Sequence, residues 1–155
     1  MAISKQERYD QLFVDIATRV GLMSHDEKYK VGTVIVKDGN IISMGWNGMP
    51  KGMDNETRCH TGCTKPEVLH SEANALMKLI KSGGGAAGST IYCSLSPCMD
   101  CAKLIHQAGI ERVVFAKSYS TASGDAGRLF LHERGINIEC VKPSNNISTG
   151  EDSQG

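Results

Sequence analysis

The sequence has no surplus of either charge and no internal repeat. Its 155 residues include 17 basic and 17 acidic side chains, so the formal net charge is zero. A protein that holds a long nucleic-acid backbone usually carries a basic excess or a basic stripe, and neither is evident here. The charge balance therefore argues against polymeric RNA or DNA as a partner and favours a small substrate.

Long hydrophobic runs are also missing. No apolar stretch approaches the roughly 20 residues that span a bilayer, and the first ten residues, MAISKQERYD, lack the apolar segment of a secretory signal. We therefore expect a cytoplasmic protein with no membrane partner, in a compartment where thiols stay reduced. Its six cysteines are then interpreted as metal ligands, catalytic groups or core residues before disulfides.

What is present is a regular alternation of helical and extended patterns. A capping box at Ser4 opens a helix that Gly21 ends. Two β-rich runs, 31–36 and 41–45, flank an Asp-Gly pair, which is a strong hairpin signal. The rest of the pattern predicts, in alternation, helices at 72–81, 97–107 and 126–134 and strands at 90–95, 110–116 and 136–141.

Strands that alternate with helices after an initial hairpin indicate an α/β fold. We expect three layers, α/β/α, around a central mixed sheet of about five strands, in a single domain over residues 1–142. The polar residues 143–155 are predicted to be a disordered tail. Between them, residues 47–69 form an irregular segment with three glycines, two prolines and two cysteines. A loop of this length inside a compact domain is more often functional than idle.

Two cysteines, Cys98 and Cys101, occur in the stretch SPCMDC. Ser96 suits a helix N-cap and Pro97 the first helical position, which would place both thiols in the first turn. The positive end of a helix favours thiolates there. The Cys-x-x-Cys spacing alone is compatible with a redox pair, with two inert buried thiols, and with half of a metal site.

The stretch His70-Ser71-Glu72 favours the metal site. It opens the preceding predicted helix, and both helices adjoin the predicted strand 90–95, so their N-terminal ends can meet at one edge of the sheet. One histidine and two cysteines give zinc three ligands and leave a fourth position for water, which is the catalytic pattern. Glu72 is then a candidate proton shuttle. Residues two apart on a regular helix point roughly 200° apart, so convergence of His70 and Glu72 requires an irregular first turn.

His-x-Glu followed by Pro-Cys-x-x-Cys is the pattern of zinc nucleobase deaminases. Over residues 5–141 the sequence resembles the cytidine-deaminase-like superfamily, and within it the deoxycytidylate (dCMP) deaminase branch. The resemblance is carried by Val31-Gly32, Gly45-Trp46-Asn47-Gly48-Met49-Pro50, His70-Ser71-Glu72-Ala73-Asn74-Ala75 and Ser94-Leu95-Ser96-Pro97-Cys98-Met99-Asp100-Cys101-Ala102-Lys103.

The resemblance implies a hydrolase that converts dCMP to dUMP and so supplies dTTP synthesis. Catalytic Zn²⁺ would be held by His70, Cys98 and Cys101, with Glu72 as the proton shuttle. Ser71 stands where alanine is more usual, a change small enough that we expect little effect from it.

The same resemblance implies substrate contacts from Asn47, to the deoxyribose, from Tyr119, near the pyrimidine or phosphate, and from Lys28, to the phosphate. Each has a plainer alternative, because Asn47 also suits a turn, Tyr119 an exposed loop and Lys28 a solvated surface. Relatives carry a cysteine where this chain has Asp26, which is a departure from the family pattern.

Some relatives bind a second, structural zinc near the irregular segment. Here Cys59, His60 and Cys63 are close enough in sequence to share a metal, and His25 could complete the set. The resemblance further implies a homo-hexamer that is activated by dCTP with Mg²⁺ and inhibited by dTTP. Nothing in the composition or periodicity of the sequence bears on these regulatory expectations.

Two other functions stay open at this point. One is a nucleoside deaminase or a tRNA-editing deaminase on the same fold. The neutral charge and the long segment between Asn47 and His70 argue against tRNA as the substrate. The other is a non-catalytic module that binds zinc or nucleotides. Such a module has no reason to place Glu72 beside the metal.

Overall fold

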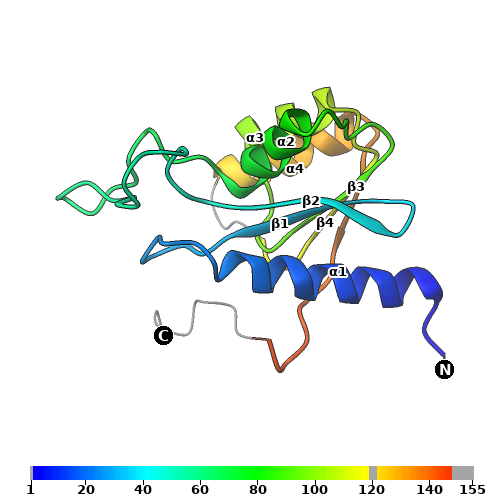
Figure 1. Ribbon diagram of the computed structural model, residues 1–155. Helices are drawn as coiled ribbons and strands as arrows, with labels where there is room; N and C mark the ends of the chain where they lie inside the picture. The colour runs from blue at the N-terminus through cyan, green and yellow to red at the C-terminus, as the bar shows by residue number, and fades with distance from the viewer. Residues whose placement is uncertain (1, 119–121, 148–155) are drawn as a thin grey trace.

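Five strands form one mixed sheet between two helical layers (Figure 1). The computed structural model describes residues 2–118 and 122–147. The strands lie in the order β2-β1-β3-β4-β5. Their bounds are β1 Gly32–Lys37, β2 Asn40–Trp46, β3 Thr90–Cys93, β4 Arg112–Phe115 and β5 Asn137–Cys140. β1 pairs antiparallel with β2 and with β3, and β3, β4 and β5 run parallel.

The helices divide unequally between the two faces of the sheet. α1 (Lys5–Gly21) covers one face alone, and α2 (Ser71–Lys81), α3 (Met99–Gln107) and α4 (Ala122–Glu133) gather on the other (Figure 1). The predicted α/β/α architecture with a five-stranded mixed sheet is therefore confirmed. No helix among the described residues has both the length and the apolar character that crossing a membrane requires.

The central strand β1 shows why the sheet needs cover on both faces. Consecutive side chains of a strand point to opposite faces, and Val34 packs against the α1 side while Ile35 packs against the α2 side. Both are fully buried. The turn into β2 places Asp38 at φ 52° and Gly39 at φ 77°. This left-handed pair is the geometry that matches the twist of a two-residue hairpin, as the Asp-Gly signal predicts.

Glycine is required where α1 ends against the start of β1. A Cβ on Gly32 would lie 2.0 Å from the carbonyl oxygen of Ala17 and 2.3 Å from the backbone nitrogen of Gly21. These are backbone atoms that no side-chain rotation can move aside. The close approach fixes the residues just before β1, of which Tyr29 and Val31 line a cavity described below.

A buried ion pair joins α1 to the sheet. Both carboxylate oxygens of Asp10 accept hydrogen bonds from the guanidinium of Arg112, each at 2.7 Å, and Oδ1 also accepts one from the Tyr92 hydroxyl at 2.7 Å. Asp10 is only 3% exposed. Burial by itself raises the pKa of Asp10, but the hydrogen bonds from Arg112, Tyr92 and Gln6 outweigh it and hold that pKa below its ordinary value. Charge on Asp10 therefore stabilises the fold.

Element boundaries differ from the predicted ones at two helix starts. α3 begins at Met99 rather than at residue 97, and Cys98 is its N-cap with an extended backbone. The backbone N–H of Ser96 donates to the carbonyl oxygen of Lys117, so this part of the chain is still tied to the segment that follows β4. α4 begins at Ala122, four residues before the predicted start at 126.

The segment after β5 turns back along α1. The backbone N–H and the hydroxyl of Ser144 donate to the two carboxylate oxygens of Asp15, at 2.8 and 2.6 Å. The side chain of Gln11 donates to the carbonyl oxygen of Lys142. Residues 148–155 of the predicted tail lie outside the described residues, and the domain boundary at 142 stays a prediction.

Candidate active site

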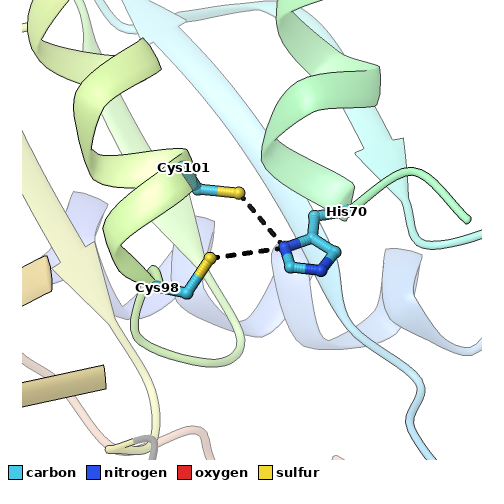
Figure 2. A group of neighbouring side chains, drawn as sticks. All are labelled: His70, Cys98 and Cys101. Atoms are coloured by element: carbon cyan, nitrogen blue, oxygen red, sulfur yellow. Dashed lines mark hydrogen bonds between the residues drawn. The ribbon is translucent and has the colours of Figure 1, made fainter. Parts of the chain in front are cut away.

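Three side chains with metal-binding atoms meet at one edge of the sheet (Figure 2). Nδ1 of His70 lies 3.3 Å from Sγ of Cys101 and 3.5 Å from Sγ of Cys98. The ligand atoms of all three lie within 4.8 Å of one another, and no other such group of three was found among residues 2–118 and 122–147. The sequence therefore predicted the one trio that the described chain brings together.

Topology explains the meeting. α2 runs toward the start of β3 and α3 leaves from its end, so the N-termini of both helices lie beyond the same end of β3. His70 is the N-cap of α2 and Cys98 is the N-cap of α3, with Cys101 in the first turn. The His70 backbone is extended, at φ −70° and ψ 157°, which frees its side chain from the helical direction of Glu72. The irregular helix start that convergence of His70 and Glu72 requires is therefore present.

The donor set matches zinc, because one imidazole nitrogen and two sulfurs are common protein ligands of that ion. A hydrogen bond with Cys101 lowers the pKa of Cys98 to about 4, against the opposing effect of burial, and His70 adds to the lowering. The hydrogen bond between Cys101 and Cys98, together with burial, raises the pKa of Cys101. The bond to Cys98 raises the pKa of His70, which burial opposes. The trio thus holds protons that a bound divalent cation would displace.

Glu72 lies beside the trio in a small cavity of about 120 Å³. It is 4% exposed and sits in the first turn of α2. His70 and Cys98 line the same cavity, whose apolar wall includes Val31 and Leu95. The cavity therefore combines metal ligands, a buried carboxylate and an apolar surface for a planar ring.

Two buried hydroxyl groups contact the carboxylate. Ser71 Oγ donates to Oε1 of Glu72 at 2.5 Å, and Thr33 Oγ1 lies 2.8 Å from Ser71 Oγ. Both residues are fully buried. Thr33 belongs to no motif that marks it as functional in the sequence, and the serine at position 71 was expected to have little effect. The separation of 38 residues between the two hydroxyls leaves no local signal that could have paired them.

Asn47 lines the cavity, but its amide already has backbone partners. Oδ1 accepts from the N–H of Val31 at 2.9 Å and Nδ2 donates to the carbonyl oxygen of Tyr29 at 2.8 Å. Asn47 therefore holds the strand entrance that forms one wall. Lys28 is not among the residues that line this cavity; its ammonium lies over the ring of Tyr29, 5.4 Å from the centroid. Tyr119 lies outside the described residues.

Arg58 is a cavity residue that the sequence analysis missed. Its Nη2 donates to Oδ1 of Asp26 at 2.7 Å, and its Nη1 donates to Oγ1 of Thr64 at 2.8 Å. Asp26 is 1% exposed, so this ion pair ties the irregular segment 47–69 to the residues before β1. The replacement of the family's cysteine by Asp26 is the sequence feature that could have pointed to a cationic partner at this position, although it did not identify Arg58.

The candidates for a second metal are arranged differently from the first trio. The structure joins Cys59 to Cys63 in a disulfide, so in this state their sulfurs are not thiolate ligands. His25 and His60 line an open cavity beside Cys59, together with Lys28 and Arg58. The structure therefore does not show a second zinc.

The Asp26–Arg58 tie predicts a measurable pH dependence. Burial raises the pKa of Asp26, but hydrogen bonds from Arg58, the Tyr29 N–H, Thr57 and the Lys28 N–H lower it below the ordinary value of 3.8. A folded pKa below the unfolded one means that ionised Asp26 stabilises the protein above about pH 3.8, and that this stabilisation is lost as the pH falls through the folded pKa.

Melting temperatures of the parent and of Asp26→Asn, measured from pH 7 to pH 2.5, test this expectation. The parent should be more stable at pH 7, and the gap should narrow below about pH 3.8. A gap that stays constant over the whole range would show that ionised Asp26 does not stabilise the fold.

Known proteins are similar to this chain in sequence. The family model described as the cytidine and deoxycytidylate deaminase zinc-binding region matches residues 5–117. The deoxycytidylate deaminase of Mycobacterium phage D29 is 35% identical over 123 residues, which cover 70% of this chain and 94% of that protein. The human deoxycytidylate deaminase is 35% identical over 145 residues, covering 87% of this chain and 80% of that protein.

A solved structure extends the likeness to three dimensions. The dCMP deaminase of the cyanophage S-TIM5, crystallised in complex with dCMP and dUMP, has a TM-score of 0.80 and 34% identity, and the match covers 90% of this chain and all of that one. The family model spans more than half of the chain and includes the His70, Cys98 and Cys101 trio. This chain therefore belongs to the cytidine and deoxycytidylate deaminase family and carries its zinc-binding region.

Proposed function

We propose that this protein catalyses the hydrolysis of dCMP to dUMP and ammonia. The observation that carries the proposal is the convergence of His70, Cys98 and Cys101 with the buried carboxylate of Glu72 in one cavity. The 34% identity to a deaminase solved with dCMP and dUMP supports the choice of substrate.

Each part of the cavity has a task in this reaction. His70, Cys98 and Cys101 would hold zinc, which would lower the pKa of a bound water to about 7 and so make a nucleophile available at neutral pH. Glu72, a buried general acid–base group, takes one proton of the attacking water to N3 of the pyrimidine. It then takes the second proton of that water to the 4-amino group, which leaves as ammonia while the oxygen stays on C4. Val31 and Leu95 give the ring an apolar wall and limit the entry of other water.

A second cavity supports a phosphorylated substrate. It has a volume of about 580 Å³ and shares Tyr29, Val31 and Leu95 with the catalytic cavity. Lys30 and Lys142 are among its lining residues, and no aspartate or glutamate lines it among the residues that the structure describes. A positive cavity that adjoins the site of the ring suits the phosphate of a nucleotide better than it suits an uncharged nucleoside.

Three individual substrate contacts remain proposals. Asn47 is placed at the wall of the catalytic cavity, which supports a contact with the deoxyribose. Lys28 precedes Tyr29, which borders both cavities, and this supports a contact near the phosphate. The role of Tyr119 near the pyrimidine or phosphate rests on the family resemblance.

Initial rates with dCMP, deoxycytidine and an unmodified tRNA test the function. We expect kcat/KM for dCMP to exceed that for deoxycytidine by about 100-fold, because a charge-assisted hydrogen bond contributes roughly 1.5–3 kcal/mol. We expect no deamination of tRNA. Equal rates on nucleotide and nucleoside would contradict a phosphate requirement, and no loss of the cytosine absorbance band in the zinc-loaded protein would contradict the proposed reaction.

The family resemblance supports further proposals on regulation and assembly. These are activation by dCTP with Mg²⁺, inhibition by dTTP, a homo-hexamer and a cytoplasmic location. The same assay with and without each effector tests the first two. A second zinc at His25, Cys59, His60 and Cys63 would need the Cys59–Cys63 disulfide to be reduced, so zinc should be counted in reduced and oxidised protein.

A further inference from the structure

We propose that Ser71 and Thr33 are positioning residues that hold the carboxylate of Glu72 for proton transfer. The inference rests on the proposed function, since it assigns these two hydroxyls a role in the same reaction. Neither residue belongs to the metal-binding trio, and of the two only Ser71 lines the catalytic cavity.

The hydrogen-bond direction in this cluster is determined by proton count. A serine hydroxyl has one proton to donate, and Ser71 gives its proton to Oε1 of Glu72 at 2.5 Å. Thr33 must therefore be the donor in the 2.8 Å contact between the two hydroxyls. Its distance to Oε1 is longer, at 3.5 Å. The result is a directed chain from Thr33 through Ser71 to the carboxylate.

Rigid elements hold the chain in place. Thr33 lies in β1 and pairs with Cys93 of β3, so its backbone is fixed in the interior of the sheet. Ser71 opens α2, and β2 packs directly against this first turn: a Cβ on Gly45 would lie 2.7 Å from the carbonyl oxygen of Ser71. The two hydroxyls thus connect β1 to the first turn of α2, which carries Glu72.

The chain of hydroxyls ends on one oxygen of the carboxylate. Oε1 accepts the Ser71 hydrogen bond and lies 3.5 Å from Oγ1 of Thr33, and in the part of the chain that the structure describes neither hydroxyl bonds Oε2. A carboxylate with one oxygen anchored has a restricted rotation, so the other oxygen of Glu72, which lines the cavity, is held in a narrow range of directions. Proton transfer needs donor and acceptor within hydrogen-bond reach in a defined direction. Anchoring one oxygen therefore favours the productive orientation of the other.

The test compares Ser71→Ala with the parent. We expect kcat for dCMP to fall about 10- to 100-fold, the effect of losing one hydrogen bond to a charged group. We expect KM and the dissociation constant for dUMP to stay within about twofold, because Ser71 acts through Glu72 and not on the ligand. Zinc content should remain that of the parent.

Two variants of Thr33 separate positioning from structure. Thr33→Val keeps the shape and removes the donor, and should lower kcat in the same direction as Ser71→Ala. Thr33→Ser keeps the donor and should retain parental kcat. Ser89→Ala is the matched control, since Ser89 is also a buried serine but its hydroxyl has no hydrogen-bond partner within residues 2–118 and 122–147.

Three outcomes would overturn the inference. They are a Ser71→Ala enzyme as active as the parent, a loss of kcat that follows lost zinc or lost folded protein, and equal damage from Thr33→Ser and Thr33→Val. Each leaves the proposed reaction standing, because the parent still deaminates dCMP. A parent that does not turn over dCMP contradicts the proposed function instead. The dissociation constant for dUMP is measured whether or not the parent turns over dCMP.

Discussion

Replacing Glu72 with glutamine should lower kcat for dCMP by about 1,000-fold while the protein stays folded and keeps its zinc. Proton transfer by a positioned acid–base group contributes roughly 10²- to 10⁴-fold to a rate, and an amide cannot take up and release the proton. The amide has nearly the shape of the carboxylate and can still accept the Ser71 hydrogen bond through its oxygen. The substitution therefore removes the proton-transfer group and keeps the packing of the side chain.

The measurement is kcat by loss of cytosine absorbance, with zinc counted on the same samples. Glu133→Gln is the control, because Glu133 is an exposed carboxylate at the end of α4. It should leave kcat within about twofold. An active Glu72→Gln variant would mean that another group carries the proton, and loss of zinc in that variant would mean that Glu72 supports the metal site.

Replacing Arg112 with methionine should lower the free energy of unfolding by about 3–5 kcal/mol, which is the usual effect of removing one partner of a buried ion pair. The substitution leaves the carboxylate of Asp10 in the interior with hydrogen bonds from Tyr92 and Gln6 but no counter-charge. The side chains of Asp10 and Arg112 are only 4% and 15% exposed, so water cannot replace the lost partner. Urea unfolding measures the effect.

Two controls show whether the buried charge is the cause. Lys103→Met breaks the pair between Lys103 and Asp100, whose side chains are 58% and 86% exposed. An exposed pair contributes about 0–1 kcal/mol, so this variant should be nearly as stable as the parent. Adding Asp10→Asn to Arg112→Met removes the orphaned charge and should restore part of the lost stability. A double variant less stable than Arg112→Met would show that the ionised carboxylate is not what destabilises it.

Local patterns predicted the elements well and their ends less well. The Asp-Gly hairpin and the helix from Ser4 to Gly21 depend on neighbouring residues, and both are present. The predicted start of α3 was wrong by two residues. The N–H of Ser96 is bonded to the carbonyl oxygen of Lys117, a partner 21 positions away that capping rules, which use neighbouring residues, do not include. Side-chain partners were harder still, because Arg112 and Asp10 are 102 residues apart.

The α/β architecture, the metal-ligand trio and the family could all be predicted from the sequence, because each depends on residue types at short spacings or on a pattern shared with relatives. How these residues act together depends on the folded arrangement of the chain. It placed His70 and Cys98 as N-caps, which frees their side chains from helical directions. Packing brought Thr33 to Ser71 beside Glu72 and brought Arg58 to Asp26, although these pairs are 38 and 32 residues apart in the chain. Contacts of this kind form when packed elements meet, and sequence spacing carries no record of them.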